Sequence, residues 1–259
     1  MTSNNFDFGE FIEFSITKRF GLITLNRVKR ANAITLEMAK NLKKAIEYCQ
    51  NNQKIRGLIL TGNGSTFTTG MDMNFIDGSD HGAVKGFEKT AADIATLLYN
   101  GKPAICAING RAMGDGVAYA LCSDYRIAVK DSFFQMPEVK SGIFPGAGNI
   151  VLMSRILGIP WTKRILMFAQ KVSSEKALDI GLIDQIVDDR EELMEETMRM
   201  ARFLFTKNQF ILNGIKLCSN HLMDKSYREA YEIEKEFLYS WVDSKNKEDA
   251  LNEFRKKFE

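Results

Sequence analysis

Three short stretches of this chain are mostly apolar, and this pattern restricts the fold more than any other feature. They are residues 58–61 (LILT), 104–108 (AICAI) and 125–129 (YRIAV). Strands of this kind are typical of sheets that are buried on both faces, because a strand with one solvated face alternates apolar and polar residues. Helical spacing of apolar residues recurs between these strands. The sequence therefore predicts an α/β fold with helices packed on a sheet.

The segment before these strands predicts two further elements. Residues 11–16 and 20–25 are β-rich runs on either side of a short basic turn, which indicates a hairpin. A helix capped by Thr35 should follow. Its apolar residues recur at helical spacing: Leu36, Ala39, Leu42, Ile46 and Cys49.

Strand patterns stop near residue 188, and amphipathic helical patterns continue to the end of the chain. A length of 259 residues fits one large domain or one domain with an appendage, at roughly 150 residues per domain. We therefore predict a core over residues 1–188 and a helical region over residues 189–259. The helices of that region need a surface for their apolar stripes, either the rest of the chain or another subunit.

Charge and cysteine content exclude several classes of protein. Thirty-five basic and 33 acidic residues leave a formal charge of +2, which is too small for a protein built around nucleic acid or an anionic membrane. The four cysteines form no CxxC pair, so no zinc site is expected. The sequence shows neither a secretory signal pattern nor an apolar run long enough for a membrane span, so we expect a cytoplasmic protein.

Motifs for metals and common cofactors are also absent. The two histidines, His81 and His221, stand alone, and no HExxH pattern occurs. Residues 110–116 (GRAMGDG) have the wrong spacing for a Walker loop or a dinucleotide-binding GxGxxG. Neither a metal nor a bound cofactor is therefore expected.

Three segments remain as candidates for chemistry. Residues 68–72 (TTGMD) and 109–116 (NGRAMGDG) follow predicted strands, and their glycines allow the backbone to approach a ligand. One unpaired amide from each could hold a developing oxyanion, although ordinary strand-to-helix turns have the same pattern. In the third segment, Glu138 follows a proline among apolar neighbours. Burial there would raise its pKa and suit it to proton transfer, whereas most glutamates are solvated surface groups.

Together these segments resemble the crotonase family, also called the enoyl-CoA hydratase/isomerase family. The resemblance runs over almost the whole chain, and the joint order and spacing of the motifs make it specific. The motifs are Asn26-Arg27 with Asn32-Ala33, Phe67-Thr68-Thr69-Gly70-Met71-Asp72, Lys102-Pro103, Ala107-Ile108-Asn109-Gly110, residues 122–128 (CSDYRIA), Pro137-Glu138, Gly142, Pro145-Gly146-Ala147-Gly148 and Gly181-Leu182-Ile183.

The resemblance implies a spiral of repeated ββα units and a C-terminal helical region that forms a homotrimer or a dimer of trimers. It also implies an acyl-CoA thioester as substrate, with no cofactor besides the coenzyme A of that substrate. The backbone N–H groups of Met71 and Asp115 would hold the thioester oxygen. The basic side chains of Lys29 and Arg30 could meet the phosphates of coenzyme A, or could simply be solvated. Further expected substrate contacts are Ala31, Gly70, Asp72, Met73, Asn74 and Phe144.

Two positions depart from the family pattern. Family hydratases use two glutamates, and here the first falls at Ala118, which cannot accept a proton, while the second is Glu138. One glutamate is sufficient for a double-bond shift, so the leading hypothesis is a Δ3-Δ2 enoyl-CoA isomerase. Enoyl-CoA hydratase, acyl-CoA hydrolase or decarboxylase, and a non-catalytic acyl-CoA-binding protein are the alternatives. Asp115 replaces a glycine and could cap a helix, face solvent, or act as a second acid/base.

Overall fold

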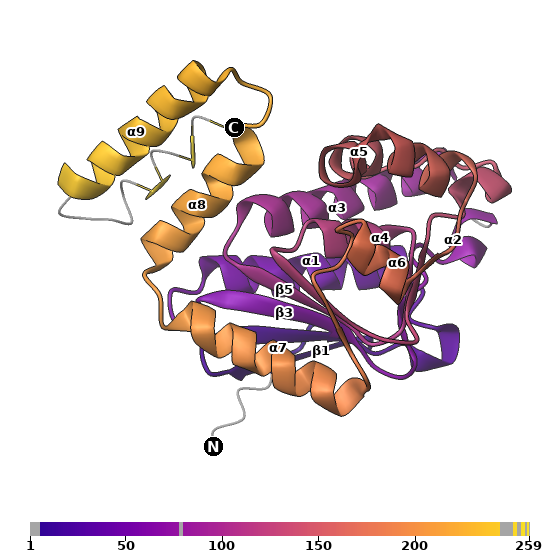
Figure 1. Cartoon of the computed structure of the whole chain (residues 1–259). Helices are drawn as coiled ribbons and strands as arrows, with labels where there is room; N and C mark the ends of the chain where they lie inside the picture. Colours follow the sequence, from indigo (N-terminus) through magenta and orange to yellow (C-terminus); the bar gives the residue numbers. More distant parts are fainter. Residues whose placement is uncertain (1–5, 78–79, 244–250, 253–254, 257, 259) are drawn as a thin grey trace.

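The computed structural model of the chain describes residues 6–77, 80–243, 251–252, 255–256 and 258. Two β-sheets and the helices around them form the main body of the molecule (Figure 1). Helices α8 (Gln209–His221) and α9 (Tyr227–Asp243) lie at one end of it.

The larger sheet has the strand order β1-β2-β3-β5-β7-β10. These strands are β1 (Ile12–Thr17), β2 (Phe20–Leu25), β3 (Gly57–Gly62), β5 (Ala104–Ile108), β7 (Tyr125–Val129) and β10 (Gln185–Val187). β1 and β2 form the predicted antiparallel hairpin, and the other neighbours are parallel. Every residue of β3 and β5 is buried, which confirms the expectation of a sheet covered on both faces.

Helices cover the two faces of this sheet (Figure 1). Leu58 and Leu60 share one apolar cluster with α1 (Leu36–Asn51) and α3 (His81–Asn100). Ile59, which points to the opposite face, shares another cluster with Leu193 of α7 (Arg190–Phe205). The predicted cap of α1 is confirmed, because Thr35 Oγ1 accepts the N–H of Met38 at 3.2 Å.

A smaller sheet positions the candidate site. Its order is β4 (Thr66–Thr68), β6 (Arg111–Met113), β8 (Phe133–Gln135) and β9 (Val172–Ser173). β4, β6 and β8 are parallel, and each follows a strand of the larger sheet after a short connection. The carboxyl ends of parallel strands meet at one edge of a sheet. The segments after residues 68, 113 and 135 are therefore brought together.

Shorter helices and α5 follow these strands and complete the repeated strand–strand–helix units. They are η1 (Val28–Arg30), α2 (Met73–Asp77), α4 (Asp115–Leu121), η2 (Glu138–Ser141), α5 (Asn149–Met167) and α6 (Ser174–Asp179). α4 directly follows β6, and its apolar residues are buried, including Ala118. The turn into α4 is therefore fixed by packing on both sides.

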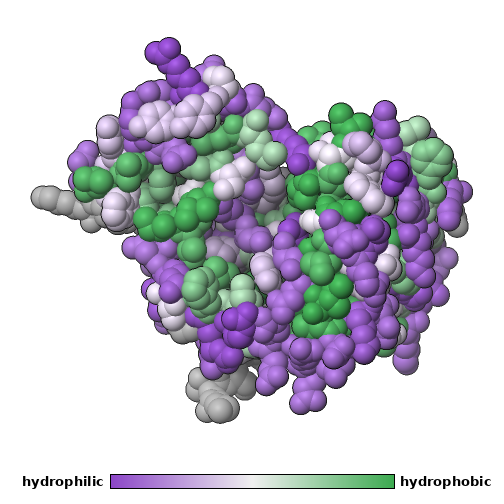
Figure 2. Space-filling model, in the orientation of Figure 1, coloured by the Kyte–Doolittle hydropathy of each residue, from purple (hydrophilic) through white to green (hydrophobic). Residues whose placement is uncertain are grey.

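The C-terminal helices divide into two groups by packing. α7 opens the region predicted as 189–259, but it packs on the larger sheet and so belongs to the core. α8 and α9 bury a separate cluster that includes Phe210 and Phe237. Apolar side chains also gather on the surface of these two helices and the loop between them (Figure 2): Ile215 on α8, Met223 in the loop, and Leu238, Trp241 and Val242 on α9. Within the described residues, no helix has the length and apolarity that crossing a bilayer requires.

Candidate active site

The loop after β4 holds the backbone N–H of Met71 toward the pocket. Ile34 forms a parallel bridge with Met71: its N–H donates to Gly70 O at 2.8 Å, and its carbonyl accepts from Asp72 N at 2.9 Å. Backbone groups alternate in direction along an extended segment, so the N–H of Met71 points away from Ile34. Met71 lines the pocket on that side.

Glycines allow the loop after β4 and the turn after β6 to touch. A Cβ built on Gly70 would lie 3.1 Å from Asp115 N and 2.9 Å from Met113 O, and the φ of Gly70 is +76°. Any larger residue would therefore be strained and would push the two segments apart. The amides of Met71 and Asp115 come from stretches more than 40 residues apart, and the structure places them at the same wall of the pocket.

The side chain of Asp115 lies at the same cavity. Burial, followed by the nearby charges of Glu88 and Glu138, raises the pKa of the Asp115 carboxyl to about 7. The backbone N–H groups of Met71 and of Asp115 itself have the opposite and smaller effect on this pKa. The surface that Asp115 retains faces the cavity, so protein groups surround the carboxyl on its other sides. Asp115 does not face open solvent.

Glu138 reaches the pocket from the third segment. It begins η2 directly after Pro137, and a Cβ built on Gly114 would lie 3.3 Å from its Oε1. Burial raises the pKa of Glu138, opposed only by a hydrogen bond from its own backbone. Its other oxygen, Oε2, is buried and has no hydrogen-bond partner among the described residues. A carboxylate in this setting can accept a proton from a ligand.

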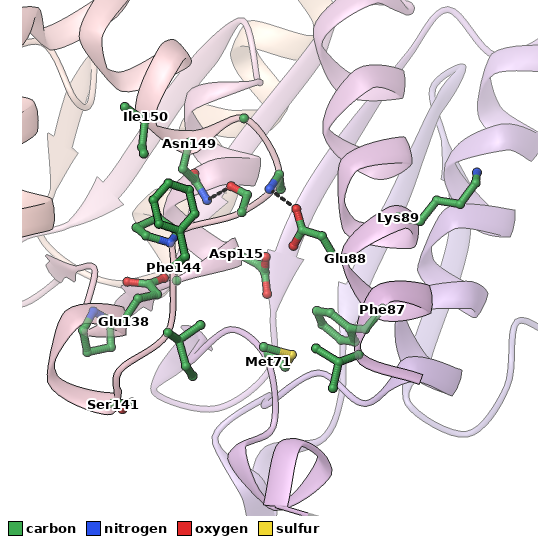
Figure 3. Close-up of a pocket in the computed structure, with 18 of the residues that line it drawn as sticks. Met71, Phe87, Glu88, Lys89, Asp115, Glu138, Ser141, Phe144, Asn149 and Ile150 are labelled. Atoms are coloured by element: carbon green, nitrogen blue, oxygen red, sulfur yellow. Dashed lines mark hydrogen bonds between the residues drawn. The ribbon is translucent and has the colours of Figure 1, made fainter. Parts of the chain in front are cut away.

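These three segments border a cavity of about 840 Å³, which is within the usual range for small-molecule sites. Figure 3 shows the carboxyl groups of Asp115 and Glu138 turned toward its interior, with Met71 and Phe87 below them. The side chains and backbone that line the cavity include Thr69, Met71, Met73, Phe87, Glu88, Gly114, Asp115, Glu138, Ile143, Phe144 and Ile150.

Glu88 is a third carboxylate at this cavity, and sequence reasoning missed it. It lies on α3, and its carboxylate accepts the N–H of Ala147, in the loop that leads from η2 to α5 (Figure 3). Its sequence neighbours Lys85 and Lys89 suggest an ordinary exposed helix face. Only the packing of α3 beside residues 143–148 shows that Glu88 borders the cavity. Among the described residues, no group of three acidic, histidine or cysteine side chains is arranged to hold a metal ion.

The predicted substrate contacts fall into two groups. Met71, Met73, Asp115 and Phe144 line the cavity together with Glu138. Phe144 is 81% exposed, so it forms an outer wall. Lys29, Arg30, Ala31, Gly70, Asp72 and Asn74 do not line the cavity.

Within the second group, Asp72 supports the site from behind. The Asp72 carboxylate bonds the guanidinium of Arg27 at 2.6 Å and accepts the N–H of Asn74 at 3.1 Å. Burial alone would raise the pKa of Asp72, but the hydrogen bonds from Arg27 and Asn74 and the charges of Arg27 and Arg30 together hold this pKa below its usual value. Lys29 and Arg30 lie exposed on η1, and Arg30 lies 3.8 Å from Asp72. Asp72 thus fixes the loop of Met71 instead of facing a ligand.

Comparison with known proteins agrees with this geometry. The sequence profile of the family described as enoyl-CoA hydratase/isomerase matches residues 16–259. The chain is 30% identical over 248 residues, 92% of each chain, to the short-chain-enoyl-CoA hydratase of Clostridium acetobutylicum. It is 30% identical over 233 residues, 88% of each chain, to the 1,2-epoxyphenylacetyl-CoA isomerase of Escherichia coli.

A solved structure shows the same fold. The enoyl-CoA hydratase from Bacillus anthracis superposes with a TM-score of 0.86 over 96% of this chain and 97% of that chain, at 24% identity. This confirms the expected crotonase-type α/β architecture. With a family profile that matches nearly its whole length, the chain belongs to the enoyl-CoA hydratase/isomerase family.

Proposed function

We propose that the protein catalyses a Δ3-Δ2 double-bond shift in an enoyl-CoA thioester, with Glu138 as the base that moves the proton. The observation that carries this proposal is the position of Glu138. Its carboxylate lies beside Gly114, at the wall formed by Met71 and Asp115, and one of its oxygens is unpartnered. No cofactor takes part other than the coenzyme A of the substrate.

The reaction uses one carboxylate twice. Glu138 removes a proton from C2 of a 3-enoyl thioester, and the electron pair moves through the carbonyl to give a dienolate. The N–H groups of Met71 and Asp115 donate to the enolate oxygen, where the negative charge develops. Glu138 then returns the proton to C4, which leaves the conjugated 2-enoyl thioester. Atoms and charge balance without water.

The position of Ala118 supports an isomerase over a standard hydratase. Ala118 is 1% exposed, it carries no ionisable group, and it does not line the cavity. Addition of water needs one group to activate the water and another to protonate C2. The side chain that family hydratases place at this position is absent here.

Conversion of 3-enoyl-CoA esters to conjugated 2-enoyl-CoA esters tests the proposal directly. We expect an increase in the ultraviolet absorbance of the conjugated thioester. Glu138→Gln should lower kcat/KM by two to four powers of ten, roughly the contribution of a general base. Absence of the increase with every acyl chain length, or full activity in Glu138→Gln, would contradict the proposal.

Hydration is a second candidate, because Asp115 places another carboxyl group near Glu138. Burial raises the pKa of both groups, so one could be neutral while the other is ionised. The named relative from Clostridium acetobutylicum is a hydratase. Mass spectrometry of products from 2-enoyl-CoA separates the two candidates, since hydration adds one water to the substrate and isomerisation leaves its mass unchanged.

The same resemblance leads us to propose a homotrimer, or a dimer of trimers, assembled through the C-terminal helices. Exposed apolar side chains on α9, including Leu238 and Val242, give that face surface to bury against another copy. Light scattering after size-exclusion chromatography should give three or six times the chain mass of 29.4 kDa. A monomer under dilution to micromolar concentrations would contradict this proposal.

A further inference from the structure

A hydrogen bond at the border of the cavity joins α3 to the loop before α5. The Glu88 carboxylate accepts the N–H of Ala147 (Figure 3). Among the described residues, it is the one hydrogen bond between α3 and residues 143–148. Gly146 packs directly on the same carboxylate, because a Cβ built on Gly146 would overlap all three atoms of the Glu88 carboxyl group. Glu88 therefore holds this part of the loop against α3.

The backbone conformation of Ala147 depends on such a restraint. Its φ of +50° lies in the left-handed region, which a residue with a side chain seldom adopts unless surrounding contacts hold it. Asn149 adds local bonds: its backbone N–H and its side-chain amide donate to Gly146 O at 3.0 and 2.9 Å. The link that fixes the loop to another element of the fold is thus the bond to Glu88.

The loop separates the cavity of the candidate active site from a second hollow. This hollow of about 190 Å³ lies between α3 and α5, and Ala147, Gly148 and Val151 line it as well as the cavity. A chain that passed the loop would therefore leave one space and enter the other. The remaining residues that line the hollow are mostly apolar: Ala95, Thr96, Tyr99, Asn100, Cys122, Leu152 and Arg155.

We propose that the hydrogen bond between Glu88 and Ala147 sets the length of the acyl chain that the cavity accepts. With the bond intact, the loop is a closed wall, and the end of a short chain stops against it. With the bond broken, the loop can move away from α3, and a longer chain continues into the second hollow. The proposal rests on the proposed function, because it places the thioester at Met71 and Asp115 and the acyl chain beyond them.

Burial of apolar groups makes chain length a sensitive probe of this wall. Each methylene that enters an apolar space should raise the affinity about fourfold, whereas a methylene left in water adds little. A chain that is too long for the closed cavity must displace the loop or leave its end in water. Affinity should therefore rise with chain length and level off where the chain meets the wall.

Calorimetry with saturated acyl-CoA esters, from butanoyl-CoA to dodecanoyl-CoA, tests the proposal without turnover. Wild-type affinity should rise and then level off. Glu88→Leu cannot accept the Ala147 N–H, so its affinity should keep rising for about two more carbon atoms. At that length, its affinity relative to butanoyl-CoA should exceed the wild-type value about tenfold. Glutamine keeps an oxygen that can accept this N–H, so Glu88→Gln should level off at the same chain length as wild type.

The shape of these profiles decides the matter. A wild-type affinity that rises without a break to dodecanoyl-CoA would show that the loop is not a wall, and it would overturn the proposal. The same conclusion would follow if wild type and Glu88→Leu had equal profiles. A Glu88→Gln profile that matches Glu88→Leu would overturn the role of the hydrogen bond, because glutamine retains the acceptor.

Gly146→Ala breaks the same contact from the side of the loop, and it provides a test that leaves Glu88 in place if Glu88→Leu does not fold. The added methyl would overlap the Glu88 carboxylate, so the loop should move away from α3. The affinity of Gly146→Ala should rise to the same longer chains as that of Glu88→Leu. A profile like that of wild type would overturn the proposal.

Thr96→Phe tests where the longer chain goes. Thr96 lines the second hollow but not the cavity, and a phenyl ring there would fill the hollow. Added to Glu88→Leu or Gly146→Ala, it should restore the wild-type limit. A double variant that still gains affinity from longer chains would overturn the assignment of the hollow to the acyl chain. Absence of 3-enoyl-CoA isomerisation would overturn the proposed function only, because the binding profiles involve no turnover.

Discussion

Met71 and Asp115 each present one backbone N–H to the same pocket, but the segments around them are held differently. The Met71 segment is fixed from behind by the bridge to Ile34 and by the ion pair of Asp72 with Arg27. The Asp115 segment is a turn between β6 and α4, held by the 3.2 Å bond from Gly114 N to Gln135 O. Only the second segment adds an ionisable side chain to the cavity. In the proposed oxyanion hole, the Met71 segment would therefore be insensitive to pH, whereas the Asp115 segment carries a side chain that can change its charge.

The largest expected effect comes from Asp115→Asn, which removes the ionisable side chain from the second segment. The folded-state pKa of Asp115 is raised from 3.8 to about 7, so its contribution to stability is present below about pH 4 and is lost as pH rises through about 7. The loss is at most on the order of 4 kcal/mol, because the carboxyl keeps some surface in the cavity. Denaturant unfolding across this range should show the decline in wild type. This decline in the free energy of unfolding should be absent from Asp115→Asn. Equal pH profiles of the two proteins would contradict the prediction.

Gly70→Ala tests how closely the two segments must approach. The added methyl would meet Met113 O and Asp115 N at a backbone conformation that disfavours any side chain, so the two amides should separate. We expect kcat/KM to fall by roughly two powers of ten, as for loss of one oxyanion donor. Gly86→Ala is the matched control, because a methyl on Gly86 in α3 meets nothing within 4 Å. Equal activity of the two variants would show that the close approach does not matter.

Asp72→Asn tests the anchor of the Met71 segment. The substitution removes the charge that pairs with Arg27 in a site where Asp72 is 8% exposed. The free energy of unfolding should fall by about 2 kcal/mol, the value of a charged hydrogen bond. Asp188→Asn breaks an ion pair in which Asp188 is 79% exposed, and it should change stability by less than about 0.5 kcal/mol. A similar small effect for both would mean that Arg27 and Asp72 do not anchor the loop.

The smallest expected effect concerns Phe144, which forms an outer wall of the cavity. Phe144 lines the cavity but is 81% exposed, so a bound acyl chain would cover only part of its ring. Phe144→Ala should raise KM about fivefold, equivalent to about 1 kcal/mol, with kcat little changed. Phe168→Ala serves as the control, because Phe168 is 75% exposed and lies outside the cavity. Unchanged KM in Phe144→Ala with long acyl chains would remove Phe144 from the binding surface.

Much of this arrangement was predictable from the sequence, because it follows from periodicity and strand order. The uninterrupted apolar runs predicted the buried strands β3, β5 and β7 of the larger sheet. The short strands β4, β6 and β8, which place the segments at 69–72, 114–116 and 136–138 on one sheet edge, were not predicted. Family resemblance then identified which amides and which glutamate to expect there. These features depend on local residue type and on short-range connections.

Other features depend on contacts between distant elements, which a single sequence does not show. Glu88 belongs to the cavity only because α3 packs beside the loop that contains Ala147. The family resemblance implied that Asp72 and Asn74 touch substrate, but neither residue lines the cavity. Neighbouring side chains point in opposite directions along an extended segment, and Asp72 consequently meets Arg27 behind the pocket. The position of the Asp115 carboxyl at the cavity likewise depends on how distant elements pack together.

The segment from Arg27 to Ile34 would connect the two ends of the substrate if Lys29 and Arg30 meet the phosphates of coenzyme A, as the family resemblance implies. Its η1 turn carries Lys29 and Arg30 at the surface, while Arg27 and Ile34 hold the residues on either side of Met71. Phosphate binding by Lys29 and Arg30, where it occurs, would thus bear directly on the position of the Met71 N–H. Thioesters shortened to N-acetylcysteamine should accordingly lose turnover rate as well as affinity, since remote binding energy helps to orient the reacting group.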